Sequence, residues 1–424
     1  WPALKAGLIQ PLDERYKYIN GGTGRGESGV SYRFLHDRVQ QAAYLVADDG
    51  ARGANHLLIG RLLLRHTTQQ RLDGALFEIV EQLNAGRALM HDAGERARLA
   101  ALNLQAGVKA RRSAAFQATL EHMRTGLDLL PAQAWNVHAD LWLDLQLGAA
   151  EAAYLCGQFA AAEAIYPLVR ARALSPLQQV RCIAIQAHQY QLQGRLLEAI
   201  AVQREGLAQL DIDIPHDVAH MKARFADILA AIGRLPGGHA PETLLAAGEM
   251  CDPGAVAAMQ MMQGLWMASY YAGQQDLSAL MVVSMTRLSM QQGSSDFSAV
   301  GYVGYAMMLA LYSGDVARGY DFGAMAMALA RRRANLQTRT LTALMFGALS
   351  NHWTRPLRSS DALYEEAFGW ALEIADFVQV GVVAAVRATD RIILGDYLPH
   401  LLHDVGHDLA LMRANGQQAM ADCC

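Results

Sequence analysis

The chain has 424 residues, 52% of them hydrophobic, and a formal net charge of −4 at pH 7. That length exceeds one ordinary hydrophobic core and predicts roughly two or three domains or an array of repeats. The nearly balanced charge, without a basic run, argues against nucleic acid or an anionic membrane as the main partner. No run of about eighteen uncharged apolar residues is present to form a membrane span.

The chain starts with WPALKAGLIQ, which contains neither an initiator methionine nor the charged and apolar regions of a signal peptide. We therefore interpret it as a fragment of a longer protein without a secretion signal. The cysteines are scattered and form no C-x-x-C pair, a usage typical of reduced thiols: Cys156, Cys182, Cys251, Cys423 and Cys424. We expect a cytoplasmic protein.

A glycine-rich stretch near the amino terminus, NGGTGRGESG from Asn20 to Gly29, almost spells the phosphate-binding pattern G-x-x-x-x-G-K-[ST]. Glu27 stands where that pattern has lysine, so a carboxylate would face the phosphates and repel them. The flanking sequences GLIQPL, residues 7–12, and VSYRFL, residues 30–35, predict two short strands instead of a buried strand followed by a helix. We interpret the stretch as a connection between these strands.

The second strand is followed at once by a predicted helix over residues 38–46, in which Val39, Ala42 and Val46 share one face. Asp37 is the predicted N-cap of this helix. A strand that leads into a helix after a hairpin resembles the end of a winged-helix module.

From about residue 39 onward, nearly every segment has apolar residues at spacings of three and four, as in LFEIVEQL and DLWLDLQLGAAEAAYL. Helix breakers fall singly between these segments, as in LLPAQAW and LPGGHAPE. The pattern predicts an all-α fold after the first strands.

Glycines that would end a helix recur with gaps of 37, 39, 40, 41 and 81 residues: Gly157, Gly194, Gly233, Gly273, Gly314 and Gly395. Five residues after each stand Ala162, Ala199, Gly238, Ser278, Gly319 and His400, of which all but the histidine are small. In a helical hairpin the glycine ends the first helix in the left-handed conformation, and the small residue lets the second helix cross closely. The period of about 40 residues predicts stacked hairpins that share a core.

The sequences YLCGQFAAAEAIY and LQGRLLEAIAVQREGL resemble tetratricopeptide repeats (TPRs), although those repeat about every 34 residues and carry Trp and Pro signatures that are mostly missing here. The predicted fold class is an all-α, TPR-like superhelix of helical hairpins after a small winged-helix-like α+β remnant. The predicted domains are the end of a winged-helix-like module at 1–48, a helical connector at 49–110 and TPR-like repeats at 111–424.

Several segments together resemble the region that follows the predicted ATPase domain in large bacterial signalling proteins: YRFLHDRVQQAAY, HLLIGRLLL, LFEIVEQLNAGRALM, GYVGYAMMLALYSGDVARGYDFGAMAMALA and LYEEAFGWALEIADF. Those proteins join a Ser/Thr-kinase-like domain, an AAA-type ATPase of the signal-transduction (STAND) class, a TPR-like helical region and often a GAF and a sensor histidine kinase domain.

The resemblance implies a non-catalytic regulatory module that binds a protein partner or adjacent domains and relays or senses a signal between ATPase and kinase. Walker and kinase motifs are absent from the sequence, as is a histidine phosphoacceptor box. We therefore expect the ATPase upstream of Trp1, any histidine kinase downstream of Cys424, and no enzyme activity in this fragment. ATP or ADP and Mg²⁺ are implied as cofactors of the parent protein only.

One site follows from the resemblance. Leu35-His36-Asp37 matches a Met-His-Asp triplet whose histidine lies near the phosphates of ADP in STAND ATPases, so His36 and Asp37 are a candidate phosphate-sensing position with the missing ATPase domain. The commoner alternative is that Asp37 is an N-cap and His36 a surface residue.

Residues with metal-ligand chemistry share one helical face near the carboxyl terminus: His400, Asp404, His403, His407 and Asp408. Gly406 interrupts the group, and no H-E-x-x-H motif is present. We therefore predict no metal site.

Two further groups have structural and functional interpretations. The methionines Met250, Met259, Met261, Met262 and Met267 favour core packing over an adaptable binding groove, because they share faces with Leu and Ala. The arginines Arg111, Arg112, Arg331, Arg332 and Arg333 favour an interaction with helix C-termini over phosphate binding.

Two other functions compete with the regulatory module, namely a small-ligand-sensing helical domain and a winged-helix-plus-TPR transcriptional regulator. A polar inner face of the repeats would favour a protein partner. A closed apolar pocket with few polar groups would favour a ligand.

Overall fold

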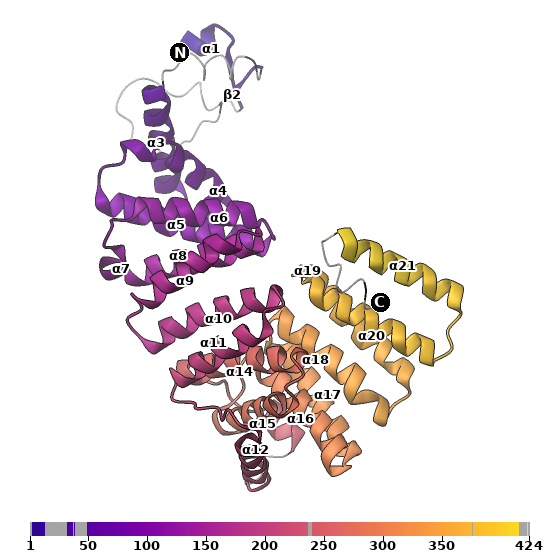
Figure 1. Cartoon of the computed structure of the whole chain (residues 1–424). Coiled ribbons are helices and arrows are strands. Elements are labelled where there is room, and N and C mark those ends of the chain that lie inside the picture. The colour runs from indigo at the N-terminus through magenta and orange to yellow at the C-terminus, as the bar shows by residue number, and fades with distance from the viewer. Residues whose placement is uncertain are drawn as a thin grey trace. The chain divides into compact units, whose positions relative to one another are not determined.

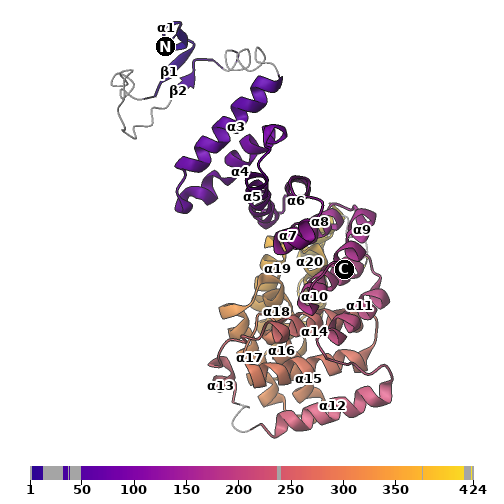
Figure 2. The ribbon, with the colours of Figure 1, turned by 90° about the vertical axis from the view of Figure 1, so that its left-hand side faces the viewer.

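The computed structural model describes residues 2–12, 32–36, 38, 49–235, 240–374, 376–414 and 422. Helices follow one another along nearly all of these ranges, which contain one two-stranded sheet (Figures 1 and 2). The prediction of an all-α helical-repeat fold is confirmed. None of the helices in these ranges is long and apolar enough to cross a lipid bilayer.

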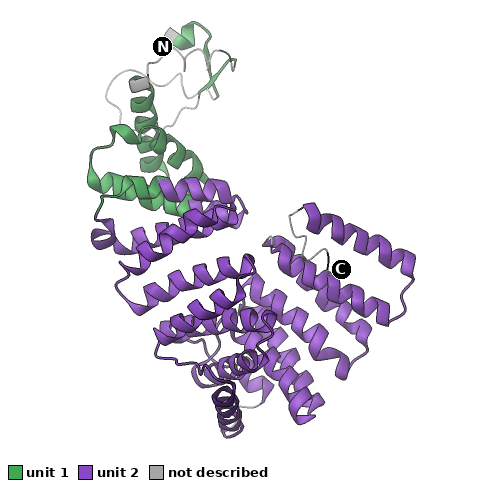
Figure 3. Ribbon diagram, in the orientation of Figure 1, with its two compact units in different colours: residues 1–106, 125–132 green, residues 107–124, 133–424 purple. Residues whose placement is uncertain are grey.

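The chain forms two compact units, residues 1–106 with 125–132 and residues 107–124 with 133–424 (Figure 3). Helices α5 (Ala93–Arg112) and α6 (Phe116–Leu129) contribute residues to both units. The predicted domain boundaries at residues 48 and 110 stay predictions.

The first unit begins with α1 (Pro2–Lys5) and β1 (Ile9–Pro11), which pairs antiparallel with β2 (Tyr32–Phe34). In the register of this pair Ile9 lies opposite Phe34. Both predicted strands are thus confirmed. The glycine-rich stretch between them and most of the predicted winged-helix segment lie outside the described residues, so the winged-helix assignment stays a prediction.

Two helices, α3 (Asp49–His66) and α4 (Gln69–Ala85), form the hairpin of the first unit, followed by the 3₁₀-helix η2 (Arg87–Leu89). The buried side chains of α4 recur at helical spacing and form its core face: Leu76, Ile79, Val80 and Leu83. At the end of α4, a Cβ on Gly86 would lie 2.7 Å from the Gly53 carbonyl oxygen, so α3 approaches closely only because residue 86 is glycine.

The second unit is a succession of helical hairpins. Its helices are α7 (Ala134–Val137), α8 (Ala139–Leu155), α9 (Phe159–Arg170), α10 (Pro176–Leu192), α11 (Leu196–Ala208), α12 (Val218–Gly233), α13 (Pro241–Leu245), α14 (Pro253–Tyr271), α15 (Gln275–Gln292), α16 (Ser298–Ser313), α17 (Val316–Arg333), α18 (Leu336–Leu349), the 3₁₀-helices η3 (Asn351–Trp353) and η4 (Leu357–Ser360), α19 (Asp361–Glu373), α20 (Phe377–Ile393) and α21 (Leu398–Ala414). One continuous apolar core runs from α10 to α20.

The hairpin glycines adopt the predicted conformation at five of the six positions. The backbone angle φ is +75° at Gly157, and it lies between +66° and +73° at Gly194, Gly273, Gly314 and Gly395. Gly233 departs from the prediction, because it is the last residue of α12 and has no positive φ. The chain leaves α12 through a longer connection that contains α13, so no tight turn requires a left-handed residue there.

The predicted small residues lie where helices cross. Ala162 and Ala199 are fully buried, and a Cβ on Gly319 would lie 2.8 Å from the Ala306 carbonyl oxygen of α16. Gly238 lies outside the described residues, and His400 is exposed on α21. The close crossing is confirmed at Gly319, and the burial of Ala162 and Ala199 agrees with it.

Ion pairs join several of the hairpins to the next one. Most of their sequence separations fall between 32 and 40 residues, about one repeat, as in Arg181–Asp144 at 2.6 Å, Arg331–Glu366 at 2.8 Å and Arg358–Asp396 at 2.7 Å. The repeat period seen in the sequence is therefore also the period of contacts between stacked hairpins.

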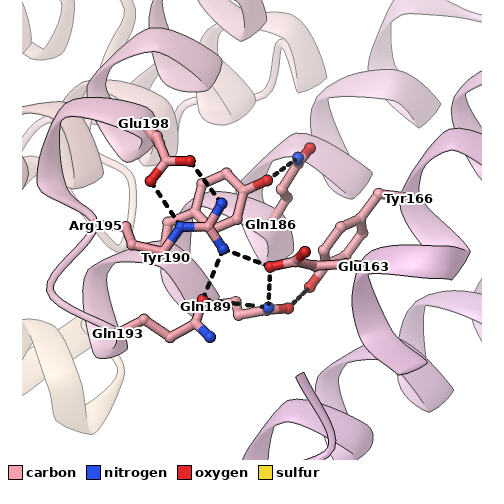
Figure 4. A network of polar contacts seen from close by, with 8 residues as sticks. All are labelled: Glu163, Tyr166, Gln186, Gln189, Tyr190, Gln193, Arg195 and Glu198. Carbon is pink, nitrogen blue, oxygen red and sulfur yellow. Dashed lines mark hydrogen bonds and ion pairs between the residues drawn. The ribbon is translucent and has the colours of Figure 1, made fainter. Parts of the chain in front are cut away.

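One of these junctions contains a larger polar network (Figure 4). Arg195 donates two hydrogen bonds, 2.6 and 2.7 Å long, to Glu198, binds Glu163 on α9 and lies 4.0 Å from the Tyr190 ring centre. Gln189 of α10, which is fully buried, donates to the same Glu163 at 3.2 Å. The network connects α9, α10 and α11 and so holds one hairpin against the next.

Candidate functional site

A cavity of about 390 Å³ lies in the second unit, in the size range of pockets that hold small molecules. It is lined by the first helices of four successive hairpins, α14, α16, α18 and α20, and by α15. Five helices between residues 253 and 393 thus contribute to one site.

The walls of this cavity are apolar. They comprise Trp266, Tyr270, Tyr271, Tyr312, Met267, Met307, Met308, Met345, Ala279, Val282, Leu311, Leu341, Leu344, Ala348, Leu349, Val382 and Val386, with Gln275, Ser278 and Gln379 as the polar members. Among these lining residues there is no Asp, Glu, Lys, Arg or His. A charged ligand would find no counter-charge in the cavity wall, so the site suits an uncharged one.

Exposed aromatic side chains border the cavity. Tyr270 is 58% exposed and Tyr312 is 68% exposed, although both side chains are large and mostly apolar. The Tyr270 ring stacks on Trp266, with 6.1 Å between ring centres and 25° between ring planes, and meets Tyr271 edge-on at 5.7 Å. An exposed aromatic group beside a cavity is typical of a binding surface.

Gln379 supplies the more deeply buried of two buried polar side chains in the cavity wall, the other being Ser278. Gln379 lies in the first turn of α20, where Asp376 caps the helix by accepting a hydrogen bond of 3.1 Å from the Gln379 N–H. Its side chain is only 3% exposed and hydrogen-bonds the Tyr271 hydroxyl. Burial raises the pKa of Tyr271, and this hydrogen bond acts in the opposite direction. Among the described residues, the Gln379 Oε1 atom has no hydrogen-bond partner.

A second group of buried titratable side chains involves α8, α10 and the start of α20. The Tyr154 hydroxyl and His188 Nδ1 lie 3.0 Å apart. Burial lowers the pKa of His188 and raises the pKa of Asp376, and each opposes the other's shift through its charge. These shifts favour the neutral form of both side chains.

The candidate phosphate-sensing residues are only partly described. His36 is exposed just after β2, where the Leu35 N–H donates to the Leu8 carbonyl oxygen at 3.1 Å. Asp37 lies outside the described residues. Their role with an ATPase domain stays a prediction.

The histidines of α21 are not brought together with its carboxylates. Asp404 pairs with Arg391 at 2.7 Å, and Asp408 pairs with Arg387 at 2.7 Å. In the part of the chain that the structure describes, no group of three His, Cys, Asp or Glu side chains is placed to hold a metal ion. The carboxylates of α21 therefore connect it to α20.

The methionines divide between the two interpretations. Met250, Met259, Met261 and Met262 are at most 4% exposed and belong to the core, as predicted, whereas Met267 lines the cavity.

The three arginines from Arg331 to Arg333 lie in the last turn of α17, and Arg331 binds Glu366 of the next hairpin with both carboxylate oxygens.

No protein-family model matches the sequence. The chain is similar to the hybrid signal transduction histidine kinase G of Dictyostelium discoideum, with 25% identity over 407 residues. The match covers 86% of this chain but only 12% of that protein.

Proposed function

We propose that this chain is a regulatory helical module of a signalling protein and performs no catalysis itself. The observation that carries the proposal is the similarity, over 86% of the chain, to a segment of a hybrid signal transduction histidine kinase. That segment is 12% of the kinase, so the relationship is to one part of a much longer protein.

In this proposal the stacked hairpins bind a protein partner or adjacent domains and relay a signal between an ATPase domain and a kinase domain. Hairpin repeats suit this task because each contacts only its neighbours and the array presents an extended surface. ATP or ADP and Mg²⁺ belong to the longer protein, with His36 and Asp37 contributing to its nucleotide site.

The apolar cavity favours a second candidate function, ligand sensing. Its uncharged walls, with three polar residues among apolar side chains, resemble a small-molecule pocket more than a polar peptide-binding face. Both candidates are regulatory, and they differ in what the second unit binds.

The 424-residue chain, incubated with labelled ATP and Mg²⁺, should neither hydrolyse the nucleotide nor become phosphorylated. In the longer gene product, Tyr312→Ala at the cavity should change the level of kinase autophosphorylation. Tyr397→Ala is the matched control, because this tyrosine has the same 68% exposure and does not line the cavity.

Phosphoryl transfer by the chain alone would refute the non-catalytic assignment. If the unaltered longer protein and both of its variants autophosphorylate to the same level, a regulatory role for the cavity is refuted.

A further inference from the structure

We propose that the cavity lined by α14, α15, α16, α18 and α20 binds an uncharged, largely aromatic small molecule that donates one hydrogen bond to Gln379. This inference rests on the proposed regulatory function and names the class of ligand that the module senses.

The size and walls of the cavity define the apolar body of the ligand. A volume of about 390 Å³ accommodates a molecule of two or three fused or linked rings. Trp266 and Tyr270 offer ring faces, and the flexible methionine side chains adapt to the outline of an aromatic guest through sulfur–aromatic contacts.

The polar requirement comes from Gln379. Its Oε1 atom is buried and has no partner in the parts of the chain that the structure describes, while the other half of its amide hydrogen-bonds Tyr271. A buried carbonyl oxygen without a donor is costly, so a ligand O–H or N–H that satisfies it gains affinity that an apolar ligand cannot.

The charge of the ligand follows from the remaining wall. Apart from the tyrosine hydroxyls, Gln275 and Ser278 are the other polar lining groups, and none of these uncharged groups can neutralise a carboxylate or an ammonium group. Taking an ion out of water without a counter-charge is strongly unfavourable. The cavity therefore selects against the charged analogue of the same aromatic body.

The probe for this site is N-phenyl-1-naphthylamine, an uncharged molecule with three aromatic rings and one N–H donor, whose fluorescence rises in apolar surroundings. It is titrated into the 424-residue chain in parallel with 1-phenylnaphthalene, which has the same rings and no donor, and with 8-anilinonaphthalene-1-sulfonate, which adds a charge. We expect saturable binding of the amine, weaker binding of the hydrocarbon and the weakest binding of the sulfonate.

Two variants locate the site. Gln379→Leu should weaken binding of the amine roughly fivefold to tenfold and leave the hydrocarbon unaffected, because only the amine loses a hydrogen bond. Tyr312→Ala should weaken binding of both uncharged probes roughly threefold to tenfold. Since Tyr312 is 68% exposed, its removal leaves the core intact and keeps the test informative if Gln379→Leu does not fold. Tyr397→Ala should bind like the unaltered chain.

Absence of saturable binding, preference for the sulfonate, or an equal effect of Tyr312→Ala and Tyr397→Ala would overturn the inference. An equal loss of both uncharged probes in Gln379→Leu would overturn the assigned hydrogen bond. None of these results affects the autophosphorylation test, so a regulatory module that binds only protein remains distinguishable from one that binds a ligand.

Discussion

The close crossing of α16 and α17 at Gly319 can be tested by adding one methyl group. A Cβ at this position would lie 2.8 Å from the Ala306 carbonyl oxygen, well inside van der Waals contact. The contacted atom belongs to the backbone and cannot rotate away, so Gly319→Ala must push the helices apart. Overpacking of this kind costs about 1–3 kcal/mol.

Alanine also has the higher helix propensity, which acts in the opposite direction by about 1 kcal/mol. Gly369 in α19 isolates that contribution, because a Cβ there meets no atom of the described residues within 4 Å. Gly369→Ala should therefore stabilise the protein slightly. Relative to it, Gly319→Ala should lower the free energy of unfolding by about 1–3 kcal/mol, a difference in which the propensities cancel.

The assay is urea-induced unfolding followed by far-UV circular dichroism, combined with amide hydrogen exchange of the α16 and α17 peptides. Exchange should accelerate in those two helices in Gly319→Ala and remain unchanged in Gly369→Ala, since local opening reports local packing. Equal stabilisation by both substitutions would refute the close crossing and its role in the hairpin repeat.

Other features of the fold give further expected outcomes. Arg387→Met leaves the Asp408 carboxylate, which is 6% exposed, without its partner and should lower the free energy of unfolding in urea by about 3 kcal/mol, most of it restored by adding Asp408→Leu. Burial lowers the pKa of His188 in the folded protein, so its contribution to stability is present above the unfolded pKa and is lost as the pH falls. In unfolding measured between about pH 7 and pH 5, the unaltered protein should therefore lose stability relative to His188→Gln as the pH falls, because the raised pKa of Asp376, which acts in the opposite sense, is present in both proteins. In the longer protein, His36→Ala should weaken ADP binding about tenfold by calorimetry, and the 424-residue chain alone should bind neither ADP nor ATP.

An unchanged urea midpoint in Arg387→Met would mean that the pair is solvated, and parallel pH profiles would mean that His188 is not kept neutral by burial. Identical ADP titrations of the longer protein with and without His36→Ala would remove the proposed phosphate contact.

The hairpin repeat could be predicted from the sequence because its signal is local. A tight helical hairpin requires a glycine with positive φ in its turn and a small residue five positions later in its second helix. Gly157 and Ala162 are such a pair. The prediction was wrong at Gly233, where the next hairpin begins only after α13 and no tight turn is formed. Spacing alone does not distinguish a tight turn from an inserted segment.

The cavity could not be predicted in the same way, because its walls extend from Trp266 to Val386 and meet only through the stacking of hairpins. Gln379 was missed for a local reason. A capping Asp376 followed three residues later by Gln matches a capping box, in which the Gln side chain returns to the helix N-terminus. Here the amide instead hydrogen-bonds Tyr271 of another helix, a contact between residues more than a hundred positions apart.

A repeat alignment would have given one signal for the border of the cavity. Tyr271 and Tyr312 both stand two residues before a hairpin glycine, Gly273 and Gly314, whereas the equivalent position in the α10–α11 hairpin is Leu192. Stacking brings equivalent positions of successive hairpins side by side, so two successive tyrosines at this position produce an aromatic border on one part of the array. Tyr312 is neither the turn glycine nor the small residue at the helix crossing, so it can change while Gly314 and Gly319 keep the stack. Binding and stability are therefore expected to respond to different substitutions.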